Sequence, residues 1–175
     1  PGGGAAVAAA PGASVAVLVM ACCRAEYLER TLNSILARLP AGKAGRYDVV
    51  VSQDGADPGV QNLMITKYPH VRHLKHIDLA PLNKDKPSES DNYYKIARHY
   101  GWALRTVFED PKKYEHVIIL EDDLEVAEDF FDYMEFGALL LRADPTLWTV
   151  TAWNDNGFAE HAQVAGAVYR SDFFG

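Results

Sequence analysis

The chain has 175 residues, of which 49% are hydrophobic and 23% charged, a composition typical of a globular protein with a sizeable core. The net charge of −7 argues against a nucleic-acid-coating protein or a protein of anionic membrane surfaces, because like charges repel. Adjacent Cys22 and Cys23 give no disulfide framework. The longest apolar stretch has about half of the ~20 residues that a membrane span needs, so we expect no membrane contact by this segment itself.

Residues 1–13 contain Gly, Ala and Pro with one Val, which predicts a low-complexity linker or stem-like segment. We place the boundary of the folded part at Ser14, so that it covers residues 14–175. Residues 15–21 are apolar throughout and predict a first buried strand. Leucines and isoleucines at helical spacing then predict an amphipathic helix that ends at Pro40.

Further elements alternate along the chain. Strands are expected at 47–52, at 71–77 with imperfect alternation, at 117–120, at 147–153 and at 164–170. Helices are expected at 59–67, from a cap at Ser90 to Pro111, and at 127–141. Strands that alternate with helices predict right-handed βαβ units, and therefore an α/β fold with a mostly parallel sheet flanked by helices.

The apolar residues 117–120 lead directly into three carboxylates, Glu121, Asp122 and Asp123. This run predicts a buried central strand. Side chains alternate along a strand, so Glu121 and Asp123 are expected on one face and Asp122 on the other. Adjacent negative charges are costly to desolvate, which favours a hard divalent cation as their partner. The alternative is an acidic helix N-terminus, which suits the carboxylates from Glu125 onward better.

Polar side chains follow the other expected strands as well. Arg24 follows the first strand, Asp54 follows the second, and an Asn-Asp-Asn segment follows the one at 147–153. Ligands of parallel sheets bind beyond the carboxyl ends of the strands. Carboxylates, a metal and an arginine at one edge suit a diphosphate-bearing substrate. For Arg24 the alternative is a surface ion pair with Glu26 or Glu29.

The sequences typical of other phosphate-binding and hydrolytic sites are absent. The chain contains no Walker A sequence, no Gly-x-Gly-x-x-Gly after the first strand and no Gly-x-Ser-x-Gly elbow. These absences argue against a P-loop NTPase, a dinucleotide-binding domain and a serine hydrolase. The remaining hypothesis is a nucleotide-sugar site with its acidic motif on a middle strand.

Six sequence blocks, in order, resemble the β-1,2-N-acetylglucosaminyltransferase I family (glycosyltransferase family 13). They lie at 17–24, 50–55, 93–100, 121–127, 152–157 and 169–174. The resemblance implies a GT-A type nucleotide-diphospho-sugar transferase fold, with residues 14–175 as its N-terminal, nucleotide-sugar-binding part. It implies an inverting hexosyltransferase of protein N-glycosylation. The enzyme would transfer N-acetylglucosamine from UDP-N-acetylglucosamine (UDP-GlcNAc), in β1,2 linkage, to a mannose of a high-mannose N-glycan acceptor.

The resemblance also implies roles for individual residues. The implied metal ligand is Asp123, for Mn²⁺ or alternatively Mg²⁺, and the implied substrate-binding residues are Arg24, Asp54, His99, Glu121 and Asp122. Asp54 and His99 would hold the uracil ring, and Arg24 would contact the diphosphate. Glu121 and Asp122 would face the donor sugar and ribose. Considered without the family, His99 is better explained as one polar residue on an amphipathic helix.

No residue of this chain is assigned as the catalytic base. In the family that carboxylate follows the Asp-Phe-Phe segment, so we expect it beyond Gly175 and expect weak or absent transfer by this chain alone. The alternative function is a non-catalytic nucleotide-sugar-binding or regulatory fragment. The family further implies a type II membrane protein of the Golgi lumen, with its anchor absent from this chain.

Two groups of residues match no functional motif. The first is the histidines His70, His73, His76, His116 and His161, of which the first three have a spacing that would suit metal ligands only on a helix. The second is the tryptophans Trp102 and Trp148, which we expect in the core.

Overall fold

The computed structural model describes residues 14–42, 45–81, 91–154, 157–158, 160–161, 164 and 166–171. They form two compact units, one ending at Glu128 and one beginning at Asp129. The linker expected at 1–13 and the helix cap expected at Ser90 lie outside the described residues. None of the described helices is both long and apolar enough to cross a lipid bilayer.

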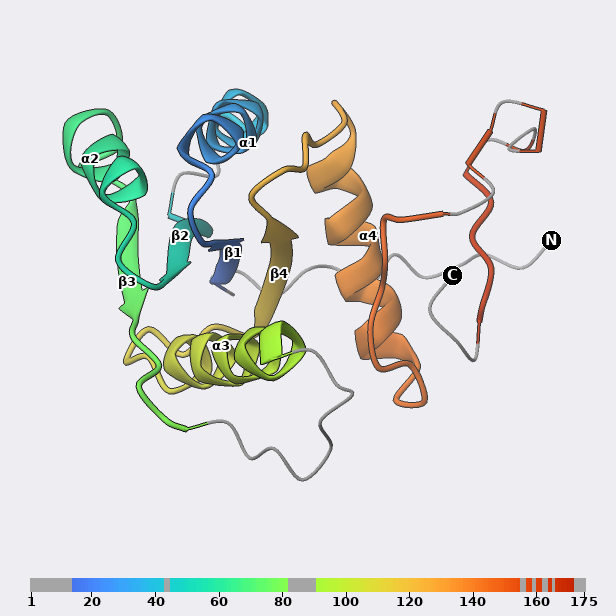
Figure 1. The fold of residues 1–175 in the computed structure, drawn as a ribbon. Coiled ribbons are helices and arrows are strands. Elements are labelled where there is room, and N and C mark those ends of the chain that lie inside the picture. Colours follow the sequence, from blue (N-terminus) through green and yellow to red (C-terminus); the bar gives the residue numbers. More distant parts are fainter. Residues whose placement is uncertain are drawn as a thin grey trace, which may run out of the picture. The chain divides into compact units, whose positions relative to one another are not determined.

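A four-stranded parallel sheet forms the centre of the first unit (Figure 1). Its strands are β1 (Val15–Ala21), β2 (Tyr47–Asp54), β3 (Arg72–His76) and β4 (His116–Glu121), in the spatial order β3-β2-β1-β4. All pairings are parallel. Every residue of β1 is buried, as its continuous apolar sequence requires for a strand covered on both faces. The predicted α/β fold with a parallel sheet is confirmed.

Helices cover both faces of this sheet (Figure 1). α1 (Ala25–Arg38) and α2 (Pro58–Thr66) lie on one face, and α3 (Asp91–Phe108) lies on the other. The core beneath α3 contains Ala16, Leu18, Met20, Val50, Ala103, Val107 and Tyr114. α2 begins after Asp57, whose Oδ1 accepts a hydrogen bond from the Val60 amide at 2.9 Å. All three helices occur where the sequence predicted them.

β4 was expected to be a central strand, and that expectation is wrong for the described sheet. β4 pairs with β1 and is the last strand in the order of the described residues. Its residue Ile119 is 41% exposed. An apolar run indicates that both faces of a strand are covered, but it carries no information on how many strands pair with its edges.

The second unit contains α4 (Phe130–Ala143), which begins three residues later than predicted because residues 128–129 form a turn. The strand expected at 147–153 is wrong: described residues 144–154 contain no strand. This segment instead packs along α4, where the Tyr133 hydroxyl donates to the Thr151 carbonyl at 2.7 Å. Trp148 is 93% exposed, so its expected core position is also wrong. The described residues between 164 and 171 contain no strand either.

Candidate functional site

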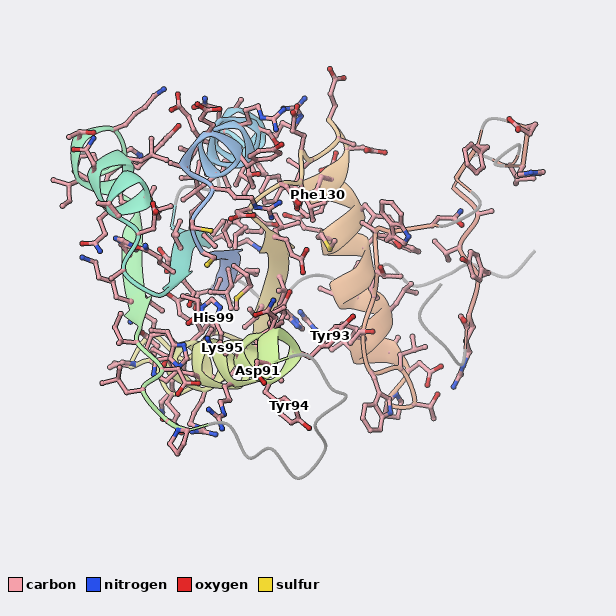
Figure 2. All side chains as sticks on the ribbon, in the orientation of Figure 1. Asp91, Tyr93, Tyr94, Lys95, His99 and Phe130 are labelled. Atoms are coloured by element: carbon pink, nitrogen blue, oxygen red, sulfur yellow. The ribbon has the colours of Figure 1, made fainter. Side chains whose placement is uncertain are left out.

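A cleft of about 640 Å³ lies at the carboxyl ends of β1, β2 and β4 and is bordered by α3. Its polar lining residues are Cys22, Arg24, Asp54, Asp78, Asn92, Lys95, His99, Tyr100, Glu121 and Asp122. Figure 2 shows His99 on the side of α3 that faces the sheet. All five residues expected to bind the substrate therefore lie around one cleft.

The acidic end of the cleft is organised around Arg24. The guanidinium forms ion pairs with Asp122 and, at 2.9 Å, with Asp123. Asp122 is only 3% exposed, and its Oδ2 also accepts from the Cys22 amide at 3.4 Å. Burial raises the pKa of the Asp122 carboxyl, and the contact with Arg24 offsets only part of that effect. Arg24 thus pairs with the acidic motif, and the alternative of a surface pair with Glu26 or Glu29 is not what the structure has.

The arrangement of the three carboxylates differs from the prediction. The strand ends at Glu121, and Asp122 and Asp123 form a turn. Side-chain alternation therefore stops before Asp123, which lies with Asp122 at Arg24 rather than on the face of Glu121. α1 holds this turn, because the Thr31 hydroxyl donates to the Asp122 carbonyl at 2.9 Å.

Glu121 faces α3, where the Tyr100 hydroxyl donates to its Oε1 at 2.9 Å. Burial and this hydrogen bond to a carboxylate raise the pKa of Tyr100 to about 12. The phenol therefore remains a proton donor at physiological pH. It fixes Glu121 at the rim of the cleft.

The opposite end of the cleft contains Asp54 and His99. The Nε2 atom of buried His99 lies 2.8 Å from the Ser52 hydroxyl, and burial lowers the pKa of this imidazole. Asp54 is bonded through Oδ1 to Nδ1 of His76 at 2.8 Å. The two residues expected to hold a uracil ring thus lie at the same end of the cleft. Asp54 is on β2 and the acidic turn follows β4, and β1 lies between these two strands.

The chain is similar to known proteins over most of its length. Residues 6–175 match the GNT-I family. The chain is 46% identical over 160 residues to the "Alpha-1,3-mannosyl-glycoprotein 2-beta-N-acetylglucosaminyltransferase" of Arabidopsis thaliana, an alignment that covers 91% of this chain. The chain belongs to the GNT-I family. It spans 35% of the length of that relative.

The chain is also similar to a solved structure over part of its length. Among solved structures, it is similar to S. aureus TarS residues 1–349, with a TM-score of 0.45 and 15% identity. That similarity covers 70% of this chain and 31% of TarS.

The carboxylates of this GNT-I family member fit a metal that shares its coordination with a substrate. No group of three or more ligand side chains occurs among the described residues. Asp123 is 34% exposed in its side chain and presents hard oxygen donors. Divalent cations at phosphate sites use one or two carboxylates and take their remaining ligands from phosphate and water. Asp123 therefore suits such a shared site, in which a bound diphosphate provides the other oxygens.

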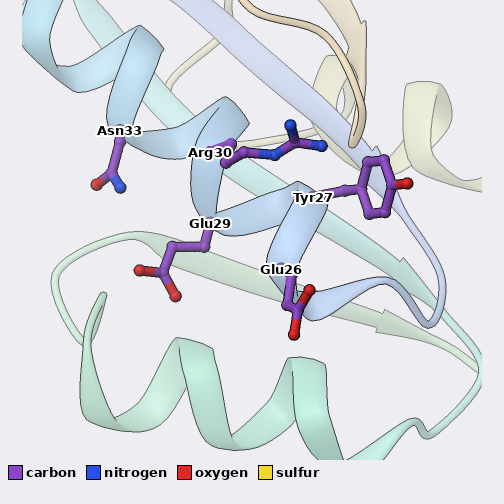
Figure 3. A pocket seen from close by; sticks show the side chains of 5 residues that line it. All are labelled: Glu26, Tyr27, Glu29, Arg30 and Asn33. Carbon is purple, nitrogen blue, oxygen red and sulfur yellow. The ribbon is translucent and has the colours of Figure 1, made fainter.

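A second hollow of about 570 Å³ lies on the outer side of α1 (Figure 3) and does not belong to this site. Several side chains that line this hollow are engaged in contacts within α1 or with residues that follow α2. Glu29 pairs with Lys67, and Asn33 accepts from the Tyr68 hydroxyl at 2.8 Å. Arg30 stacks over the Tyr27 ring, 4.6 Å from its centroid. These residues are accounted for as surface packing.

Sequence reasoning missed several residues of the cleft region, among them His76, Lys95 and Tyr100. Lys95 and Tyr100 line the cleft and lie in the block at 93–100, so the family resemblance already indicates that stretch. His76 was considered only as a metal ligand, although β2 and β3 are parallel and in a register that pairs Asp54 with His76. Correct pairing of these two strands would have found it.

Proposed function

We propose that this chain carries the donor-binding part of a metal-dependent, inverting N-acetylglucosaminyltransferase. The enzyme would use UDP-GlcNAc and form a β1,2 linkage to a mannose of a glycoprotein N-glycan. The proposal rests on the presence of Arg24, Asp54, His99, Glu121 and Asp122 around one cleft at the strand ends. Membership of the GNT-I family and the printed name of the Arabidopsis relative support the same reaction.

Asp54 and His99 recognise the uracil ring in this proposal. An ionised carboxylate accepts a hydrogen bond from the uracil imide N–H, and an imidazole N–H donates to a uracil carbonyl. Burial lowers the pKa of His99, so its ring is neutral at physiological pH and has one N–H donor. Since Nε2 lies at the Ser52 hydroxyl, Nδ1 is the nitrogen left for the base.

Arg24 binds the diphosphate, for which its planar guanidinium offers two parallel N–H donors. Lys95, which also lines the cleft, adds a second positive charge. When Arg24 turns to phosphate, the Asp123 carboxylate becomes free to hold Mn²⁺ or Mg²⁺. Such a metal, when bound, compensates the charge of the departing diphosphate. Glu121, held by Tyr100, faces the donor sugar and ribose together with Asp122.

Transfer with inversion also requires a general base at the acceptor hydroxyl. We assign that group, and most contacts to the glycan acceptor, to the part of the longer relatives outside the region matched here. By the same family argument the whole protein would act in the Golgi lumen. These assignments leave the present chain with donor binding as its own measurable property.

Calorimetry with UDP-GlcNAc, with and without Mn²⁺, tests the proposal. We expect binding to require the metal and Asp123→Ala to weaken it by at least about tenfold, the scale of losses at metal sites. Glu125→Ala is the matched control, because Glu125 is an exposed carboxylate two residues further on, and it should bind like the wild type. Binding that is independent of metal and unaffected by Asp123→Ala would overturn the proposal.

A further inference from the structure

His76 contacts both residues that the proposed function assigns to the uracil ring. Its Nδ1 atom lies 2.8 Å from Oδ1 of Asp54. Its ring is stacked on His99, with 5.4 Å between centroids and 12° between planes. His76 is not among the residues that line the cleft. It therefore lies behind Asp54 and His99 as seen from the cleft.

The hydrogen bond to Asp54 has a defined direction. A carboxylate can only accept, so Nδ1 of His76 carries the proton and donates it. This hydrogen bond occupies Oδ1 of Asp54. Among the described contacts of Asp54, no side chain is bonded to Oδ2. This leaves Oδ2 as an acceptor that can meet a ligand at the cleft.

The backbone and the aromatic neighbours keep His76 in this position. Its carbonyl accepts from the Gly55 amide at 2.8 Å, which fixes the turn after Asp54. Gly55 has φ +80°, a conformation that favours glycine. The imidazole also lies 5.0 Å from the Trp102 ring, and its side chain is only 11% exposed. The donor to Asp54 is thus held by β3, β2 and α3 together.

We infer that His76 is a positioning residue that orients Asp54 as an acceptor-only group, so that the site selects uracil over cytosine. Uracil presents an N3–H donor to the free carboxylate oxygen. Cytosine presents an N3 acceptor at the same place, and two facing acceptors repel each other. A carboxylate that turns freely would lose much of this discrimination, because it could move away from N3. This inference rests on the proposed function.

The test compares the affinities of UDP and CDP at neutral pH with Mn²⁺ by calorimetry. We expect the wild type to prefer UDP. His76→Ala should weaken UDP binding about tenfold, the scale of one hydrogen bond to a charged group, and leave CDP binding nearly unchanged. His76→Asn keeps an N–H near the position of Nδ1 and should retain more of the preference than His76→Phe, which keeps only the ring.

His73→Asn is the matched control. His73 is three residues earlier on the same strand, is half-buried, and bonds through Nε2 to Gln53 at 2.9 Å instead of to Asp54. Its substitution should leave the UDP to CDP ratio unchanged. An unchanged ratio in His76→Ala, or an equal loss for both nucleotides, would overturn the inference. Failure of the wild type to bind either nucleotide would instead overturn the proposed function.

Discussion

Arg24 and Asp123 form an ion pair, with 2.9 Å between Nη1 and Oδ2, at the acidic end of the cleft. In the proposed function each of these groups has another partner, the diphosphate for Arg24 and the metal for Asp123. A diphosphate–metal complex therefore replaces one internal ion pair by two intermolecular contacts. In the proposed function Arg24 and Asp123 would therefore each have a partner of opposite charge both before and after the donor binds.

This pairing predicts opposite effects of Arg24→Gln on two ligands. Removal of the guanidinium should strengthen binding of Mn²⁺ alone by up to about fivefold, because a half-exposed pair contributes up to about 1 kcal/mol. The same change should weaken UDP-GlcNAc binding in the presence of Mn²⁺. Electron paramagnetic resonance of free Mn²⁺ measures the first effect, and calorimetry measures the second. Arg170→Gln, which removes an exposed pair with Asp144, should change neither.

Two substitutions of Asp122 should have different effects on the free energy of unfolding, measured in urea. Asp122→Asn should change the free energy of unfolding little, since a neutral amide avoids the desolvation that raises the pKa of this carboxyl. Asp122→Ala should cost about 1–3 kcal/mol, because it leaves the Cys22 amide without its acceptor and removes one of the two carboxylates that pair with Arg24. Equal losses for both variants would contradict this account.

The protonation of the Asp122 carboxyl should also make the free energy of unfolding depend on pH. Its pKa is raised on folding, so the folded state binds more protons than the unfolded state between the two pKa values. This contribution to stability is therefore present at low pH and is lost as the pH rises through that window. A comparison of the wild type and Asp122→Asn by urea unfolding across the acidic range should show the difference, with the wild type losing more.

His99 should make stability depend on pH with the opposite sign to Asp122. Burial lowers its pKa from 6.5, so the unfolded state binds more protons and stability falls as the pH drops below 6.5 toward the folded pKa. His99→Gln should make the melting temperature less sensitive to pH in this range. His161→Gln, at an exposed histidine, is the control and should leave the slope as in the wild type.

The close approach of Gly137 in α4 to Val150 predicts that a substitution at one position can offset the loss of stability caused by a substitution at the other. A Cβ at this position would lie 2.9 Å from Cγ1 and 3.2 Å from Cβ of Val150. Gly137→Ala should therefore destabilise the protein, although alanine favours helices by about 1 kcal/mol over glycine. Val150→Ala on the Gly137→Ala background should recover stability. Additive losses in this double-mutant cycle would show that the two positions do not interact.

The first unit could be predicted from sequence because its strands and helices have clear periodicity and end at glycine, proline or charged residues. β1 is a continuous apolar run, and α1 has Leu28, Leu32 and Ile35 fully buried on one face. Strand position within the sheet was not accessible in this way, as β4 shows. Pairing of distant strands depends on the whole chain, whereas the pattern is local.

The sequence predicted which residues gather at the candidate site, but it did not predict how they are paired there. Arg24, Asp54, His99, Glu121 and Asp122 line one cleft, but their partners depend on where β4 ends. Alternation placed Asp123 on the face of Glu121, whereas the turn after Glu121 brings it to Arg24. The strand expected at 147–153 failed for a similar reason, since β-forming residues there pack along α4.

The register of β1 has a consequence for how the protein folds. β1 pairs with β2, which follows after one helix, and with β4, which follows only after three helices and two strands. Closing the longer segment costs more chain entropy, so we expect β4 to join last. Pulsed hydrogen exchange should then show amides of β1 and β2 protected before those of β4. In that order the acidic turn would reach Arg24 late in folding, so the metal site proposed at Asp123 would form only after β1 and β2 have paired.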